Sequence, residues 1–150
     1  MAQDLNEAMN SVRGAEGIPA VQYSPLVLAY IGDAFYEMVI RTMAVEQGNT
    51  QVEKLHKAVT RYVRAGAQAA MVKYFEEEGL LTEAELAVYK RGRNAKSHTI
   101  PKNADPSEYR RATGFEALMG YLYLGGECAR ALDLIRKGIE EYERKQNAKE

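Results

Sequence analysis

Two carboxylates stand in apolar segments where the surrounding pattern predicts another apolar side chain. Asp33 lies in "LVLAYIGDAFYEMVI" (26–40), and Glu116 lies in "GFEALMGYLYL" (114–124). A carboxylate buried among apolar groups is costly unless it is paired or binds a metal. Two such acids placed close together repel each other unless a cation lies between them. Mg²⁺ prefers carboxylate, water and phosphate oxygens, so the pair predicts a sparse magnesium site with positions left for water and a phosphate.

The residues beside Asp33 leave alternatives open. Gly32 costs about 1 kcal/mol in a helix interior, which indicates a close helix approach or room for a ligand. Glu37 lies one turn beyond Asp33 on the same face, where it either joins the site or faces solvent. Both acids could instead be buried groups satisfied by Arg, Lys or Tyr. A di-iron bundle is not favoured because it needs two Glu-x-x-His pairs and the sequence offers only one, Glu53 with His56. No zinc cluster, P-loop or nucleophile elbow is present.

The elements that must position these acids are all helical. Ser24-Pro25 predicts a helix start and Gly48 its end. "TQVE" and "TEAE" predict capping boxes at Thr50 and Thr82, and Gly66 bends or splits the second helix. The expected helices cover about 25–47, 50–75, 82–91, 105–124 and 128–145, with a long loop at 92–106. We therefore expect one all-α domain over 1–150, with an N-terminal extension at about 1–20 and a frayed tail at about 146–150.

Positive charge is concentrated in the basic segment, residues 90–111, "KRGRNAKSHTIPKNADPSEYRR". Its seven basic and two acidic residues give +5, which leaves −6 for the rest of a chain whose net charge is −1. Such a concentration is typical of a nucleic-acid footprint, and Gly92 would let backbone approach a phosphate. A helix with basic residues, "KLHKAVTRYVRAGAQ", offers a second strip, with Lys57, Arg61 and Arg64 on one face. The alternatives are a solvated loop and the wet side of an amphipathic helix. The RNA-binding candidates are His56, Lys57, Arg64, Arg91, Arg93, Asn94, Lys96, Ser97 and Lys102.

Composition indicates the cellular compartment in which the protein works. No apolar stretch reaches the roughly 18 residues of a membrane span, and "MAQDLNEAMNSVRG" lacks the apolar core of a signal peptide. The single cysteine, Cys128, excludes an internal disulfide and fits a reducing compartment. We expect a cytoplasmic protein.

"AYIGDAFYEMVI" and "GFEALMGYLYL" together resemble the ribonuclease III catalytic domain, which carries a Leu-Gly-Asp-Ala-type segment on one helix and a Glu-Ala-Leu-Ile-Gly-type segment on another. The similarity is greatest to the Mini-ribonuclease III branch, which has no double-stranded-RNA-binding domain, and we expect none to follow here. "RGRNAK" and the "HKAV" helix are also similar to that branch. The resemblance covers about residues 20–145 and implies a homodimeric helical bundle.

The resemblance implies that Asp33 and Glu116 are catalytic and bind Mg²⁺, with Mn²⁺ as an alternative metal. Larger relatives carry glutamates at the positions of Leu26 and Ala29 and an aspartate at the position of Thr113. Only two acids are therefore carried over, and the Thr113 hydroxyl is a candidate to hold a metal-bound water.

The resulting hypothesis is an endoribonuclease that hydrolyses phosphodiester bonds of double-stranded RNA to 5′-phosphate products. The resemblance implies a ribosomal RNA precursor (23S) as substrate and a homodimer, for which the apolar helix 25–47 is a reasonable interface. The alternatives are a non-catalytic RNA-binding module of the same fold associated with ribosomes, and a dimeric helical scaffold that touches no RNA.

Overall fold

The computed structural model describes residues 4–13, 17–96 and 99–149, and within them it contains helices and no strand. The all-α prediction is confirmed. The helices are α1 (Leu5–Ala8), α2 (Asn10–Arg13), the 3₁₀ helix η1 (Ala20–Gln22), α3 (Pro25–Gln47), α4 (Val52–Val63), α5 (Ala65–Glu77), α6 (Glu83–Arg93), α7 (Pro106–Leu124) and α8 (Cys128–Ala148).

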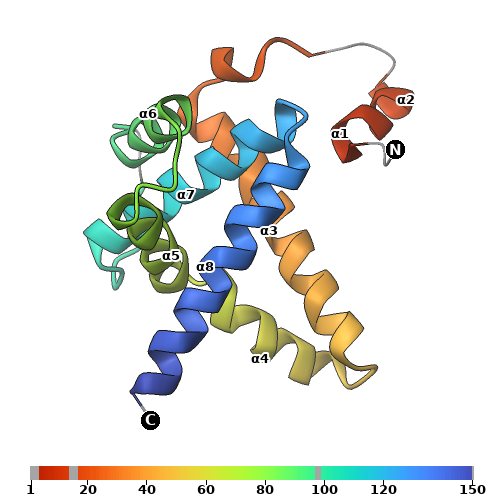
Figure 1. Ribbon diagram of the computed structural model, residues 1–150, viewed down its shortest axis with the longest axis vertical. Coiled ribbons are helices and arrows are strands. Elements are labelled where there is room, and N and C mark those ends of the chain that lie inside the picture. The colour runs from red at the N-terminus through yellow and green to blue at the C-terminus, as the bar shows by residue number, and fades with distance from the viewer. Residues whose placement is uncertain (1–3, 14–16, 97–98, 150) are drawn as a thin grey trace.

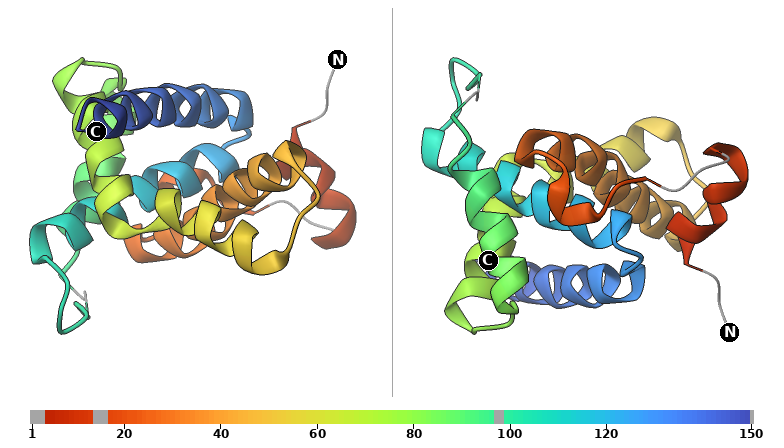
Figure 2. Two further views of the ribbon diagram at one scale, coloured as in Figure 1. Left: turned by 90° about the horizontal axis from the view of Figure 1, so that it is seen from below. Right: turned by 90° about the horizontal axis from the view of Figure 1, so that it is seen from above.

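The centre of the fold is the packing of α3 against α7, the most extensive helix pair in the molecule (Figure 1). Figure 2 shows α7 lying between α3 on one side and α8 on the other. The core forms where α5 also meets these helices. Tyr36 of α3 packs edge-on against Phe115 of α7 at 4.9 Å between ring centroids, and Phe75 of α5 contacts Phe115. Such aromatic pairs stabilise beyond their buried area. The residues next to Phe115 are thereby held in a rigid setting.

Local capping signals predict the helix starts well. Ser24 Oγ accepts a hydrogen bond from Val27 N at 3.3 Å, with Pro25 at the first helical position. Thr82 and Glu85 form the expected capping box at the start of α6. Asp105 caps α7 by accepting hydrogen bonds at its first turn. These side chains satisfy amide groups that a helix start leaves without partners.

Four expected boundaries differ from the structure. Thr50 does not open a capping box, because α4 starts one residue later and its N-cap Gln51 makes no side-chain cap. The second helix divides at Arg64, whose backbone is extended (φ −67°, ψ 154°), rather than at Gly66. The last helix continues to Ala148, past the expected frayed end. In addition, α6 runs two residues further than expected, to Arg93.

The N-terminal extension is attached to the helical body by Asp4. Its carboxylate accepts a hydrogen bond from the backbone nitrogen of Cys128 at 3.1 Å, at the start of α8, and another from Asn6 N at 2.9 Å. One acidic side chain thus caps two helices. None of the helices in the described ranges is both long enough and apolar enough to cross a membrane.

Candidate active site

The two carboxylates meet because α3 and α7 cross at glycines. A Cβ added at Gly32 would overlap the carbonyl oxygen of Glu116 and come within 2.7 Å of the Gly120 nitrogen. A Cβ added at Gly120 would in turn overlap the carbonyl oxygen of Leu28. The absence of side chains at both positions lets the two backbones touch. Asp33, the residue after Gly32, is thereby brought against Glu116.

The contact between the two acids changes the protonation of Glu116. Burial raises the pKa of Glu116 from 4.5 to about 9, helped by the negative charge of Asp33 and by a hydrogen bond with it, while hydrogen bonding from Gln68 opposes the rise. In the described part of the chain neither carboxylate forms an ion pair with Lys, Arg or His. The alternative in which basic side chains neutralise these acids therefore has no support among the described residues.

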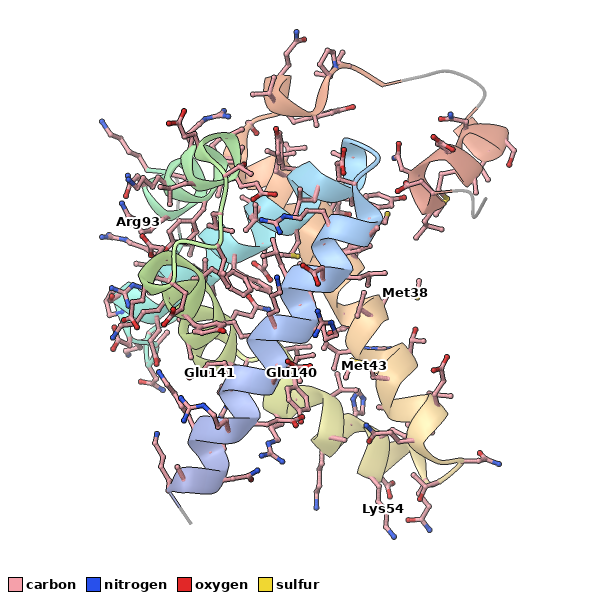
Figure 3. All side chains as sticks on the ribbon, in the orientation of Figure 1. Met38, Met43, Lys54, Arg93, Glu140 and Glu141 are labelled. Atoms are coloured by element: carbon pink, nitrogen blue, oxygen red, sulfur yellow. The ribbon has the colours of Figure 1, made fainter. Side chains whose placement is uncertain are left out.

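The expectation that both acids are buried is wrong for Asp33. Glu116 is half-buried, but Asp33 is exposed in the single chain. The apolar run around Asp33 misled the sequence analysis because α3 leaves one apolar side uncovered. Tyr30 and Met38 on this helix are 82% and 61% exposed, and Met38 projects from the outer side of α3 in Figure 3. Because the Asp33 side chain is exposed, a ligand can reach it from solvent.

A divalent cation fits this pair. Two carboxylates in contact with no basic partner repel each other, and a cation between them removes that cost. No group of three or more His, Cys, Asp or Glu side chains in the described ranges is placed to hold a metal. The two oxygen donors match Mg²⁺, which keeps several waters and binds through one or two carboxylates plus substrate phosphate.

The two supporting residues proposed from the sequence lie on the same helices as the acids. Glu37 forms an ion pair with Arg41 at 2.9 Å. Thr113 is buried, and its hydroxyl donates to the carbonyl oxygen of Tyr109 at 3.1 Å. These contacts occupy part of the hydrogen-bonding capacity of each side chain. Their roles at a metal remain predictions.

Gln68 is a site residue that the sequence analysis missed. It is 1% exposed and lies in α5 against Glu116. Its spacing to Met71, Val72 and Phe75 places an amide on the buried apolar stripe of this helix. The sequence could have identified Gln68, because it places a polar residue at an apolar position of a helix. The same reasoning identified Glu116.

The end of α6 and the start of α7 enclose a basic cavity. The cavity has a volume of about 780 Å³, and its described lining residues include four cations and no acid. Its lining residues are Arg93, Asn94, Ala95, Lys96, Pro106, Ser107, Arg110 and Arg111. The segment 99–105 that leads into α7 projects away from the packed helices (Figure 2). This arrangement presents positive charge to a ligand that carries phosphates.

Other candidates of the basic segment are placed around this cavity. Arg91 and Lys102 are exposed outside its lining, and Ser97 lies outside the described residues. Gly92 does not provide backbone to a ligand as expected. It is buried, and a Cβ there would lie 2.9 Å from Gly114 Cα, so Gly92 serves the packing of α6 on α7.

The second basic strip is divided. His56 and Lys57 are exposed on α4, whereas Arg64 lies in the break after α4 and its guanidinium donates to Tyr142 Oη at 2.6 Å. Arg64 therefore does not share a helix face with Lys57 as expected, because α4 ends before it. In Figure 3 Lys54, at the start of α4, lies far from Arg93. The RNA-binding roles assigned to His56, Lys57 and Arg64 remain predictions.

Comparison with known proteins gives a consistent result. A family model described as the ribonuclease III domain matches residues 26–127. The chain is 48% identical over 122 residues to Mini-ribonuclease 3 of Symbiobacterium thermophilum. The aligned region covers 81% of this chain and 92% of that protein. It is 52% identical over 114 residues to Mini-ribonuclease 3 of Enterococcus faecalis, in an alignment that covers 76% of this chain and 86% of that protein. A crystal structure of a Fusobacterium nucleatum protein superposes with a TM-score of 0.71 at 31% identity, covering 80% of this chain and 94% of that one. The chain belongs to the ribonuclease III family.

Proposed function

We propose that this chain is a Mg²⁺-dependent endoribonuclease that hydrolyses phosphodiester bonds of double-stranded RNA. The observation that carries the proposal is the contact between Asp33 and Glu116 across the α3–α7 crossing, with no basic partner among the described residues. Family membership and the names of the relatives support the same activity.

Asp33 and Glu116 would hold the metal from two different helices. When bound, Mg²⁺ supplies an activated water, orients the scissile phosphate and stabilises the leaving 3′-oxygen, which gives 5′-phosphate products. Glu116 must give up its proton before its carboxylate can ligate, since its pKa of about 9 keeps it protonated at neutral pH in the metal-free protein. Asp33 is the exposed member of the pair and is accessible to the RNA backbone.

The basic cavity is the proposed contact for the RNA backbone. Duplex RNA hides its base edges in a deep, narrow groove, so proteins recognise it mainly by shape, phosphates and 2′-hydroxyls. Arg93, Lys96, Arg110 and Arg111 line a concave surface suited to such phosphates. A basic surface within the catalytic domain would supply contacts that an appended RNA-binding domain gives elsewhere.

A homodimer is part of the proposal. An apolar groove of about 410 Å³ runs along α3, and a second copy of this chain is its proposed occupant. Its lining includes Phe35 and Met38 of α3 and Met9, the residue that follows α1. Contiguous exposed apolar surface of this kind is typical of obligate interfaces. We further propose a ribosomal RNA precursor as substrate, Mn²⁺ as an alternative metal and the cytoplasm as the compartment.

Asp33→Asn tests the proposed function directly. Asparagine keeps the shape of the side chain and removes the charge that binds the metal. Wild-type protein should cut a long RNA duplex in Mg²⁺. D33N should be slower by about 100-fold or more, because loss of even an outer partner of a metal ligand typically costs about 10- to 100-fold. Glu46→Gln, an exposed change on the same helix, is the matched control and should keep wild-type activity. Undiminished cleavage by D33N would remove the metal assignment.

The second candidate function is a non-catalytic RNA-binding module associated with ribosomes. The basic cavity alone would favour it, because that surface needs no metal. A duplex that wild-type protein binds but leaves intact in both Mg²⁺ and Mn²⁺ would favour this alternative over the nuclease.

A further inference from the structure

The break between α4 and α5 is held by side chains from other parts of the fold. The carbonyl oxygen of Val63 accepts a hydrogen bond from Gln68 Nε2 at 3.1 Å, whereas the Ala67 amide bonds to the Arg64 carbonyl. The carbonyl oxygen of Tyr62 accepts from the hydroxyl of Tyr36 at 2.8 Å. Carbonyls at a helix end need partners of this kind. Gln68 and Tyr36 therefore perform parallel structural tasks at the end of α4.

Gln68 does more than cap this helix end. Its amide also lies close enough to the carboxylate of Glu116 to hold down the pKa of that group. The Val63 carbonyl can only accept, so it fixes which end of the amide is the NH₂ group. The amide that bonds to the backbone at the α4–α5 break thus lies next to Glu116.

The remaining atom of the amide, Gln68 Oε1, is buried and has no hydrogen-bond partner among the described residues. Buried polar atoms are nearly always paired in native proteins, so an exception of this kind points to a functional constraint.

We propose that Gln68 is a positioning residue for the metal site: its buried amide fixes the Glu116 carboxylate opposite Asp33 by anchoring it to the Val63 carbonyl. This inference rests on the proposed function, since it concerns the same acidic pair. Partners that orient a metal-binding side chain commonly influence metal affinity by 10- to 100-fold.

Tyr36 provides the matched control because the two side chains support the same helix end and only one contacts Glu116. Gln68→Met keeps the length of the side chain and removes the amide. Tyr36→Phe removes the hydroxyl that supports the Tyr62 carbonyl and leaves the ring packed on Phe115. Both variants weaken the break, so both should lower the Tm, and only Q68M should affect the metal.

The test measures Mn²⁺ binding by electron paramagnetic resonance in the absence of RNA, with folding checked by circular dichroism. Q68M should bind Mn²⁺ at least 10-fold more weakly than wild type, and Y36F should stay within twofold. In cleavage assays Q68M should lower kcat and raise the half-saturating Mg²⁺ concentration, with KM for the duplex within twofold because the basic cavity is unchanged. If Q68M does not fold, Gln68→Asn is the second variant; its amide is one methylene too short to serve both partners, and the same 10-fold loss is expected.

The outcomes separate this inference from the proposed function. Mn²⁺ affinity of the folded Gln68 variant within twofold of wild type would overturn the role of Gln68 alone. Equal losses in Q68M and Y36F would also overturn it, because the break rather than the amide would then control the site. A wild-type protein that binds no Mn²⁺ would overturn the metal site itself and this inference with it.

Discussion

Replacing Glu116 by glutamine should stabilise the metal-free protein at alkaline pH. Glutamine has nearly the same shape and carries no charge, so E116Q removes the conflict with Asp33 and keeps the packing. In wild type the pKa of Glu116 is raised from 4.5 to about 9 by burial and by the neighbouring carboxylate. Ionisation of this group is therefore much less favourable in the folded protein than in the unfolded chain.

The sign and size of the effect follow from this difference. Between about pH 4.5 and pH 9 the folded protein holds a proton that the unfolded chain has released, so the stability of wild type falls as pH rises through this window. Each pH unit contributes at most about 1.4 kcal/mol, which gives roughly 3 kcal/mol at pH 7. Glu116 is only half-buried, and solvent screening reduces this to about 1–2 kcal/mol.

Urea unfolding of both proteins in EDTA, from pH 5 to pH 9, measures this difference. The free energies of unfolding should be nearly equal at pH 5, and E116Q should exceed wild type by about 1–2 kcal/mol at pH 7 and by more at pH 9. Glu78→Gln, at an exposed position, is the control and should parallel wild type. A parallel pH dependence of E116Q and wild type would refute the assignment of a strained acidic pair.

Three further predictions concern the scaffold and the basic surface. G32A inserts a methyl group into the α3–α7 crossing; it should cost about 2–3 kcal/mol in urea unfolding and reduce cleavage more than 10-fold, and wild-type activity would contradict the close approach. Alanine at Arg91, Arg93 and Lys96 should weaken duplex binding and flatten its dependence on salt in filter-binding assays, whereas an unchanged slope would show that these cations meet no phosphate. Arg130→Met removes the partner that lies 2.9 Å from the buried carboxylate of Glu85 on α6. The free energy of unfolding should fall by about 3 kcal/mol in thermal unfolding, with KM for RNA unchanged. A decrease in that free energy of less than about 1 kcal/mol would contradict a structural role for Arg130.

Local signals in the sequence were sufficient for most helix boundaries. Caps such as Ser24 and Asp105 act on amide groups within the same turn, so their effect can be predicted without knowing the fold. The break at Arg64 could not be predicted this way. The carbonyl groups at this break accept hydrogen bonds from Tyr36 of α3 and Gln68 of α5. The sequence next to Arg64 does not reveal these partners, because the fold brings them there.

The candidate site was predictable in part. The two acids were found because each interrupts an apolar helix. Gly32 left two explanations open, a close helix approach or room for a ligand, and the structure shows the close approach. Exposure of Asp33 was not predictable, because a pattern that is apolar on all sides does not distinguish a helix buried in the core from a helix that leaves one apolar side exposed. Gln68 was overlooked because one amide among small residues resembles an ordinary polar position.

The central claim is that Asp33 and Glu116 together hold a divalent metal. Crystals grown or soaked with Mn²⁺ and measured at the manganese absorption edge locate that metal directly. The account predicts an anomalous peak between the two carboxylates, within about 2.5 Å of an oxygen from each, and no such peak in crystals of D33N. A peak bound elsewhere in wild type, with the acidic pair empty at saturating Mn²⁺, would contradict the account.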